Sequence, residues 1–274
     1  MGLFHAVILG IVQGLAEFLP VSSSGHLVII QRLFGLDAPE LVFDIAVHVG
    51  TLIAVVIYFK RDLMAMVTAA TSMTGRILRG QANLTDAWSD PDVKLGLLII
   101  LGSIPTALIG LGFHRIAETL FSSVRMVGGM LLVTGFVVWS TRYMTKADRG
   151  IRRFSVPIAV LVGIIQGVAI IPGISRSGST IALGMFLGLK RDLAARYAFL
   201  LSLPAISGAA LLAVKDVAQG SAFSGSVILG GMVSAAVVGY LSLKLLVFIV
   251  NKGQLYIFAP YCWVVGGLAL LFGI

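Results

Sequence analysis

Ala6–His26 reads AVILGIVQGLAEFLPVSSSGH, and 153 positions later Ala159–Ser179 reads AVLVGIIQGVAIIPGISRSGS. In each of these near copies, an apolar run stops at proline, glycine and serine. In a membrane protein, a duplicated hydrophobic segment that is broken in this way is the best sequence pointer to a site at the interface of two repeats.

The composition indicates that lipid is the solvent of this chain. Hydrophobic residues make up 58% and charged residues 12% of the sequence, and the mean hydropathy is +1.02. A soluble domain carries about 25% charged residues. The net charge of +8 comes from basic residues between apolar runs, which is typical of a membrane protein with positive loops and does not favour a nucleic-acid partner. The single cysteine, Cys262, excludes a disulfide within the chain.

Six long apolar runs approach the roughly 20 residues that a membrane helix needs. These runs are Leu41–Phe59, Lys94–Phe113, Val124–Tyr143, Arg196–Val214, Ser226–Val250 and Leu255–Ile274. The longest polar stretch, Arg61–Asp92, is predicted to be a loop of mixed charge.

The two broken segments are shorter than the six runs. Leu3–Leu19 and Ser155–Ile171 are each followed, after the break, by an apolar piece of about 10 residues, His26–Phe34 and Thr180–Leu189. Because such a piece is too short to span a bilayer, we favour a re-entrant hairpin over an ordinary span with a surface loop.

The predicted fold is an all-α integral membrane protein with an inverted-topology repeat. A single membrane domain, 1–274, contains one repeat at about 1–150 and a second at about 151–274, each a re-entrant helical hairpin plus three transmembrane helices. Because three is an odd number, the second repeat is inverted, and the hairpins enter from opposite faces. Most loop Lys and Arg residues fall on one face, so we expect both termini and the mouth of the first hairpin on the extracytoplasmic side.

Charges within the membrane are functional candidates because burying them is costly. Glu17 and Arg176 lie in the two breaks, whereas Lys244 lies outside them and either snorkels or lines a cavity. Gln13 precedes Glu17 by four residues, so the two share one helix face. This pair can hold a divalent cation or orient a water, and the alternative is a helix-end glutamate that is hydrogen-bonded within the protein.

The first break supplies three hydroxyls and an imidazole, from Ser22, Ser23, Ser24 and His26. Serine is a poor nucleophile until a base takes its proton, and either His26 or Glu17 can be that base. The serines can equally cap the short helix that follows, and a helix N-terminus also attracts phosphate.

The second break, 173–180, has the composition of a phosphate-binding loop. Glycine lets backbone N–H groups approach an anion, and Arg176 offers a planar fork that stays charged when it is desolvated. The residues of this break that we predict to bind phosphate beside the arginine are Gly173, Ser175, Ser177 and Thr180. Elsewhere, His48 shares a helix face with Asp44 and can line the cavity, although a hydrogen bond to another helix is the more usual role.

At this point the sequence resembles a known family. Gln13–His26, QGLAEFLPVSSSGH, and Pro172–Thr180, PGISRSGST, are similar to the two signatures of the bacterial undecaprenyl-diphosphate phosphatases, the bacitracin-resistance family. The likeness covers the whole chain and includes the stretch Val49–Leu52. At Gln13 the family has Glu or Gln, so only one carboxylate of the pair is present here.

The resemblance implies a multi-pass enzyme of the bacterial inner membrane, with its active site facing the periplasm. It hydrolyses the C55 isoprenyl diphosphate carrier to the monophosphate, which recycles the carrier for peptidoglycan synthesis and gives bacitracin resistance, and similar proteins use Mg²⁺ or Ca²⁺. The positions that match the functional positions of the family are Glu17, Ser23, His26, Ser175, Arg176 and Thr180.

The resulting prediction assigns three groups of residues. The catalytic residues are Glu17, Ser23, His26 and Arg176. The residues expected to bind the diphosphate are Ser22, Ser24, Gly173, Ser175, Ser177 and Thr180. Glu17 and Gln13 are the expected metal ligands. Either Ser23 or a water attacks the terminal phosphorus.

Besides the isoprenyl diphosphate, the expected partners are membrane lipids, and a homo-oligomer is left open. The alternative function is a transporter or flippase for phosphate or a lipid phosphate, since broken helices in inverted repeats are a transport architecture.

Overall fold

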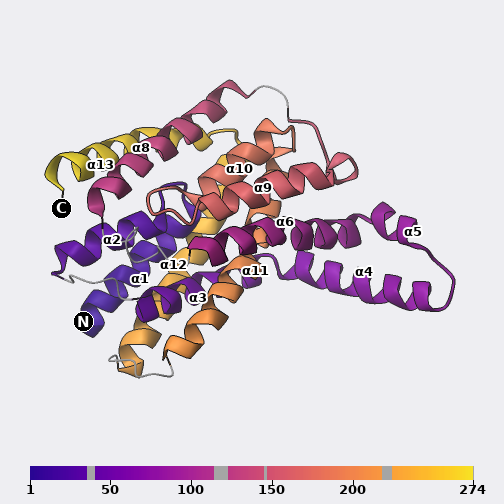
Figure 1. Cartoon of the computed structure of the whole chain (residues 1–274), viewed down its shortest axis with the longest axis horizontal. Helices are drawn as coiled ribbons and strands as arrows, with labels where there is room; N and C mark the ends of the chain where they lie inside the picture. Colours follow the sequence, from indigo (N-terminus) through magenta and orange to yellow (C-terminus); the bar gives the residue numbers. More distant parts are fainter. Residues whose placement is uncertain (36–40, 114–122, 145–146, 218–223, 274) are drawn as a thin grey trace.

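The computed structural model describes residues 1–35, 41–113, 123–144, 147–217 and 224–273. Regular structure in these ranges is helical, apart from one isolated bridge between Arg149 and Leu189. The helices before the second copy are α1 (Leu3–Phe18), α2 (Ser23–Leu33), α3 (Leu41–Tyr58), α4 (Lys60–Leu78), α5 (Leu84–Ser89), α6 (Pro91–Phe113) and α8 (Val124–Ser140). Those that follow are α9 (Val156–Val168), α10 (Arg176–Phe186), α11 (Arg191–Val217), α12 (Gly225–Asn251) and α13 (Ala259–Phe272), as Figure 1 shows.

The predicted all-α membrane fold is confirmed at this level. In the described ranges, five helical segments are long and apolar enough to cross a membrane, and they lie in α6, α8, α11, α12 and the stretch that ends in α13. The sixth predicted span corresponds to α3, which passes the same test only together with α4, across a bend of 71°. The shorter helices α1 and α9 begin the two broken segments.

The prediction that Arg61–Asp92 is a loop is wrong, because most of this stretch is helical. The segment from Leu63 to Gly75 carries no charge, and α4 buries Met73 against Ala87 of α5 and Val93 of α6. A capping box between Asn83 and Asp86 starts α5. The charged residues that suggested a loop lie at the ends of α4 and in the short stretch that contains α5 and the start of α6. Figure 1 shows α4 and α5 beside the N-terminal part of α6, extending away from the remaining helices.

The broken helices pack closely on long helices of the opposite half. Helix α1 lies against α12, and α9 lies against α6. A Cβ atom on Gly10 would come within 2.3 Å of the Gly231 carbonyl oxygen, and one on Gly163 within 1.9 Å of the Gly102 carbonyl oxygen. Since Gly10 and Gly163 are equivalent in the two copies, each copy needs glycine at the same point for the same backbone approach.

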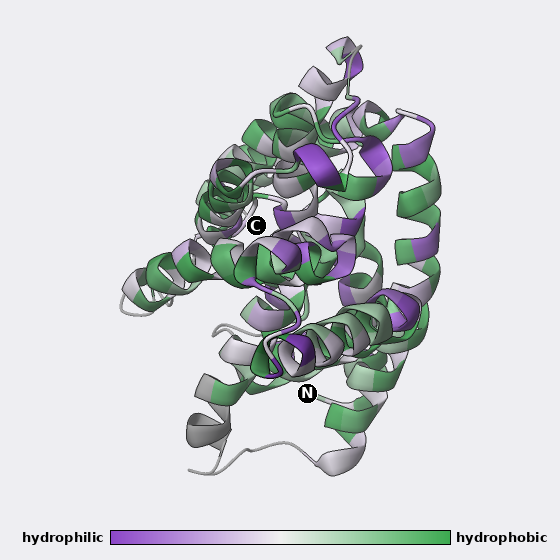
Figure 2. Cartoon of the chain, turned by 90° about the vertical axis from the view of Figure 1, so that its right-hand side faces the viewer, coloured by the Kyte–Doolittle hydropathy of each residue, from purple (hydrophilic) through white to green (hydrophobic). Residues whose placement is uncertain are grey.

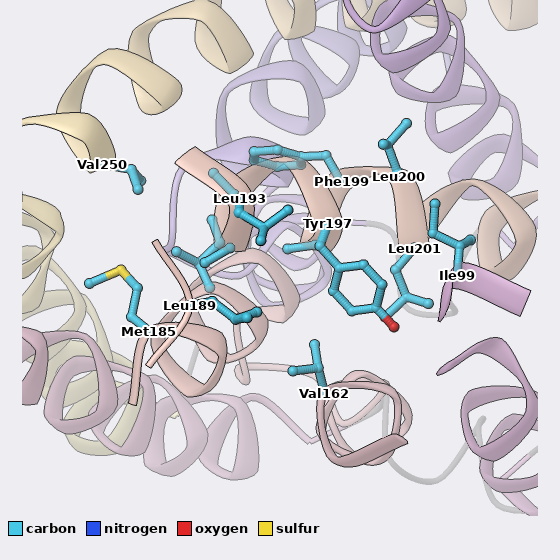
Figure 3. Close-up of a cluster of buried hydrophobic side chains, with 14 of the residues drawn as sticks. Ile99, Val162, Met185, Leu189, Leu193, Tyr197, Phe199, Leu200, Leu201 and Val250 are labelled. Atoms are coloured by element: carbon cyan, nitrogen blue, oxygen red, sulfur yellow. The ribbon is translucent and has the colours of Figure 1, made fainter. Parts of the chain in front are cut away.

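The largest core cluster surrounds α11. Figure 3 shows Tyr197, Leu201 and Val162 packed together, with Met185 and Leu189 nearby. The outer faces of the helices are also apolar in Figure 2, and Phe136 and Leu271 are 65% and 79% exposed. An apolar exterior over long helices is what a lipid solvent requires. The fold therefore packs the two broken segments into a helical bundle whose outside is apolar.

Candidate phosphoryl-transfer site

In both breaks a serine side chain caps the helix that follows. After α1 ends, Ser22 precedes α2 and its hydroxyl accepts a hydrogen bond from the Gly25 N–H (3.3 Å). After α9 ends, Ser175 precedes α10 and its hydroxyl accepts from the Gly178 N–H (3.1 Å). The capping role considered for the serines of the first break is thus confirmed for Ser22, and the structure shows the same role for Ser175 at the second break.

The two breaks touch each other. The Gly173 N–H donates to the Ser22 hydroxyl at 3.0 Å. A Cβ atom on Gly25 would lie 3.3 Å from Gly173 Cα, and one on Gly178 would lie 3.0 Å from Pro20 Cβ. Residues that are about 150 positions apart in sequence therefore form one continuous patch, in which the N-termini of α2 and α10 are neighbours.

Glu17 lies at the centre of this patch and is 7% exposed. One carboxylate oxygen, Oε2, accepts from the Ser23 hydroxyl at 2.5 Å and from Gln13 Nε2 at 3.1 Å. The other, Oε1, accepts from Arg176 Nη2 at 2.5 Å. The structure thus brings together the carboxylate, the hydroxyl and the guanidinium that the two motifs supply. Because the ion pair is largely buried, its attraction is only weakly screened by solvent.

His26 lies in the same patch but faces away from the carboxylate. In the described part of the chain, its ring contacts the Ser22 carbonyl oxygen through Nδ1 (2.9 Å) and the Tyr261 hydroxyl through Nε2 (2.7 Å). The His26 and Tyr261 rings also stack, with an interplanar angle of 9°. Nδ1 is therefore engaged at the start of α2 itself, Nε2 joins α2 to α13, and in the described ranges neither nitrogen contacts Ser23.

His48 is the residue that sequence reasoning ranked too low. Its Nδ1 lies 2.6 Å from the Asp44 carbonyl oxygen, and its Nε2 lies 3.6 Å from Glu17 Oε2. The signal in the sequence was an ionisable residue in the middle of an apolar run. The Asp44 carboxylate, which shares that helix face, instead accepts from Gln31 Nε2 at 2.6 Å.

The other predicted phosphate ligands already bond to the protein. Ser24 pairs with the Ser22 hydroxyl, and Ser175 pairs with the Ser177 hydroxyl. The Thr180 hydroxyl donates to the Arg176 carbonyl oxygen at 2.7 Å. These contacts fix the shape of the breaks. Lys244 is exposed on α12.

Two buried polar atoms at the site, Arg176 Nη1 and Gln13 Oε1, have no hydrogen-bond partner among the residues that the structure describes. An unpaired buried donor or acceptor costs free energy, and the cost is largest for a charged group. A bound anion would satisfy Arg176 Nη1, while a cation or a proton donor would satisfy Gln13 Oε1. The patch therefore has the polarity of a site for a phosphate group beside a cation.

Comparison with known proteins agrees with both motifs. A family model described as "Bacitracin resistance protein BacA" matches residues 6–268. The chain belongs to this family. Proteins named undecaprenyl-diphosphatase from Desulforapulum autotrophicum and Desulfosudis oleivorans are 49% and 48% identical to it, over 100% and 98% of this chain and 99% and 98% of their own lengths. A third, from Desulfatibacillum aliphaticivorans, is 47% identical over 97% of both chains.

In this BacA family member, the donors for a metal are few. The described residues contain no group of three or more His, Cys, Asp and Glu side chains that could hold an ion. Glu17 and Gln13 supply oxygens, and Gln13 Oε1 has no hydrogen-bond partner in the described ranges. Mg²⁺ keeps several waters and binds through one or two carboxylates plus substrate phosphates, so a donor set this small still fits it.

A cavity of about 450 Å³ lies away from this patch. It is at the C-terminal end of α10, whereas Arg176 begins that helix. Its lining includes Met185, Lys190, Arg191 and Asn251. The candidate site of this BacA family member therefore rests on its chemistry and not on the volume of a pocket.

Proposed function

We propose that this protein hydrolyses undecaprenyl diphosphate to undecaprenyl phosphate and inorganic phosphate. The relatives' names support this reaction, and so does their similarity across the whole chain. The observation that carries the proposal is the Glu17–Arg176 pair, which joins the two breaks, with Ser23 on the carboxylate and Arg176 Nη1 unpaired. The monophosphate returns to peptidoglycan synthesis, and this recycling accounts for bacitracin resistance.

The contact between Ser23 and Glu17 supports a nucleophilic serine. As Ser23 Oγ bonds to the terminal phosphorus, Glu17 takes the hydroxyl proton. The bond from that phosphorus to the bridging oxygen breaks, and undecaprenyl phosphate leaves. A water then attacks the phosphoserine, inorganic phosphate is released and the proton returns to Ser23. In the alternative, water attacks the substrate directly and Ser23 only holds a phosphate oxygen.

Arg176 stabilises the phosphoryl group in flight. One nitrogen, Nη2, keeps the guanidinium on Glu17, and the unpaired Nη1 is free to donate to a phosphoryl oxygen. The N-termini of α2 and α10 add their partial positive charges. In phosphoryl transfer, most of the catalysis comes from positioning and charge stabilisation of this kind.

A divalent cation, Mg²⁺ or Ca²⁺, fits beside Glu17. The Gln13 amide N–H donates to the Glu17 carboxylate. If the amide group were rotated by half a turn, Oε1 would lie beside the carboxylate in place of Nε2. Glu17 and Gln13 would then hold the ion together with substrate oxygens. When bound, the ion neutralises charge on the diphosphate.

His26 and Tyr261 hold α2 in place, so Glu17 is the better candidate for proton transfer.

The packing supports the finer topology, in which each half is a hairpin plus three spans. Helix α1 of the first half packs on α12 of the second, while its counterpart α9 packs on α6 of the first. An exchange of this kind is what two repeats related by a two-fold axis produce. The start of α1 and the end of α13 lie on the same side in Figure 1, opposite the α4–α5 arm. This placement of the two chain ends, together with the distribution of Lys and Arg over the loops, supports a periplasmic active site in the inner membrane.

Phosphate release from undecaprenyl diphosphate by the purified protein in detergent tests the reaction. We expect turnover that a chelator abolishes and added Mg²⁺ or Ca²⁺ restores. A transporter or flippase would bind or move the lipid without releasing phosphate. Turnover that is untouched by the chelator would remove the metal and leave Glu17 as a proton carrier, and a protein that releases no phosphate would contradict the function itself.

A further inference from the structure

Thr134, in the middle of α8, makes two hydrogen bonds to the second break. Its side chain is buried, with 1% exposed. The hydroxyl donates to the Gly173 carbonyl oxygen at 2.7 Å and accepts from the Ser175 N–H at 2.9 Å. One side chain therefore bridges the two peptide groups that flank Ile174, immediately before Arg176.

Ser22 holds the same glycine from the other side. The Gly173 N–H donates to the Ser22 hydroxyl, so both backbone polar groups of Gly173 bond to side chains from other elements. Ser22 has φ of 67° and is the single non-glycine residue with positive φ in the described ranges. A residue persists in this region only when its surroundings over-determine it, and such residues cluster at functional sites.

Helix α8 also fixes Gly173 sterically. Gly173 has φ of 95°, and a Cβ atom there would lie 2.4 Å from the Val127 carbonyl oxygen and 2.6 Å from Met130 Cβ. The backbone turn at 173–175 therefore cannot move toward α8. Hydrogen bonds also tie this turn to Thr134 of α8 and to Ser22 of the first break. The position of Gly173 is thus fixed, and the chain runs from it through Ile174 and Ser175 to Arg176.

We propose that Thr134 is a positioning residue that aims Arg176 at the site. The inference rests on the proposed function. Thr134 bonds to the backbone on both sides of Ile174, and Arg176 follows Ser175 directly. Its hydroxyl therefore sets the direction in which α10 begins, and hence where the guanidinium meets Glu17.

Removing the hydroxyl leaves the Gly173 carbonyl and the Ser175 N–H buried without this partner. The turn must then shift, or admit water, to satisfy them. A misplacement of about 1 Å at a catalytic group can cost on the order of 10²-fold in rate. We expect Thr134→Val, which keeps the shape and loses the hydroxyl, to lower kcat by about 10- to 100-fold while KM changes by less than about threefold.

Thr106 offers a matched control. It is 5% exposed, its hydroxyl donates to the Gly163 carbonyl oxygen at 2.8 Å, and it accepts from Gln166 Nε2 at 3.3 Å. Thr106→Val therefore removes an equally buried, interhelical hydroxyl that bonds to a glycine carbonyl but lies between α6 and α9. Thr106→Val should lower the thermal midpoint by about as much as Thr134→Val does. Its kcat should stay within about threefold of the wild-type value.

The experiment measures kcat, KM and the thermal midpoint for wild type, Thr134→Val, Thr134→Ser, Thr106→Val and, if the valine variant does not fold, Thr134→Ala. Hydrogen exchange over 170–180 is measured in parallel, because it reports the turn without needing turnover. We expect faster exchange there in Thr134→Val but not in Thr106→Val, and recovery of kcat in Thr134→Ser.

Two results would overturn the inference. The first is wild-type kcat, or unchanged exchange over 170–180, in Thr134→Val. The second is an equal loss of kcat in Thr106→Val, which would reduce Thr134 to general stability. A wild-type protein that releases no phosphate contradicts the proposed function instead, and the exchange comparison still decides whether Thr134 holds the turn.

Discussion

The two breaks share a serine helix cap but differ in their charged and reactive side chains. Ser22 and Ser175, which are equivalent in the two copies, cap α2 and α10 in the same way. At the positions that carry charge the copies differ: Glu17 corresponds to Ile170, Ser23 to Arg176, and His26 to Ser179. The first break thus supplies the carboxylate and the hydroxyl that bonds to it, and the second supplies the guanidinium.

This division means that neither half can form the site alone. The buried Glu17 carboxylate finds its cationic partner, Arg176, in the other half, and removing one member of a buried pair leaves an uncompensated charge. The duplicated backbone brings two helix N-termini together, and divergence of the side chains then makes the pair complementary. The following predictions test this division.

Glu17→Gln should have the largest effect, a loss of about 10⁴-fold in turnover. The variant keeps the shape but removes the charge that bonds to Ser23 and Arg176, and proton transfer alone contributes up to about this much. Phosphate release at several Mg²⁺ concentrations measures it. Recovery at high Mg²⁺ would show that Glu17 only raises metal affinity.

Ser23→Ala should lose about 10³-fold, because it removes the hydroxyl that donates to Glu17. Ser24→Ala is the neighbouring control and should lose less than about 10-fold, since the Ser24 hydroxyl pairs only weakly with Ser22, at 3.4 Å. The stereochemistry at a chiral terminal phosphorus decides the mechanism. Retention agrees with a phosphoserine, whereas inversion, or high activity in Ser23→Ala, would make Ser23 a binding residue.

Arg176→Lys should lose about 10²-fold, the effect of removing one transition-state donor. Lysine keeps the charge but not the fork that bonds to Glu17 through one nitrogen and leaves the other for phosphate. Steady-state kinetics of the purified variant measures the loss. Near-normal turnover would mean that a point charge is sufficient at this position.

The equivalent glutamines give the smallest effect and the sharpest contrast. Gln13 bonds to Glu17 near Arg176, whereas Gln166 bonds to Thr106 and the Leu201 carbonyl oxygen. Gln13→Glu should stay within about threefold of wild-type turnover and bind metal more tightly, because a cation can neutralise it. Gln166→Glu buries a charge without a cationic partner and should lower the thermal midpoint. Equal behaviour of the two variants would contradict the division of roles.

The sequence alone predicted the features that depend on local pattern. The apolar runs gave the spans, and the duplication placed Glu17 and Arg176 together, because equivalent breaks in paired repeats must meet. It did not predict that His26 faces Tyr261 or that His48 faces Glu17, since these contacts depend on how helices rotate against one another. The amphipathic helix α4 was missed because charges at its ends resembled those of a loop.

Protection of Ser23 by ligand tests most directly whether the two breaks form one site. In a Cys262→Ala background, the thiol introduced by Ser23→Cys is alkylated with and without a non-hydrolysable isoprenyl methylene-diphosphonate, and again with Arg176→Lys. We predict that the analogue protects this first-break thiol, and that Arg176→Lys raises the concentration needed by at least about tenfold, the value of one charge-assisted hydrogen bond. Protection that does not depend on Arg176, or none at all, would contradict a site shared between the halves.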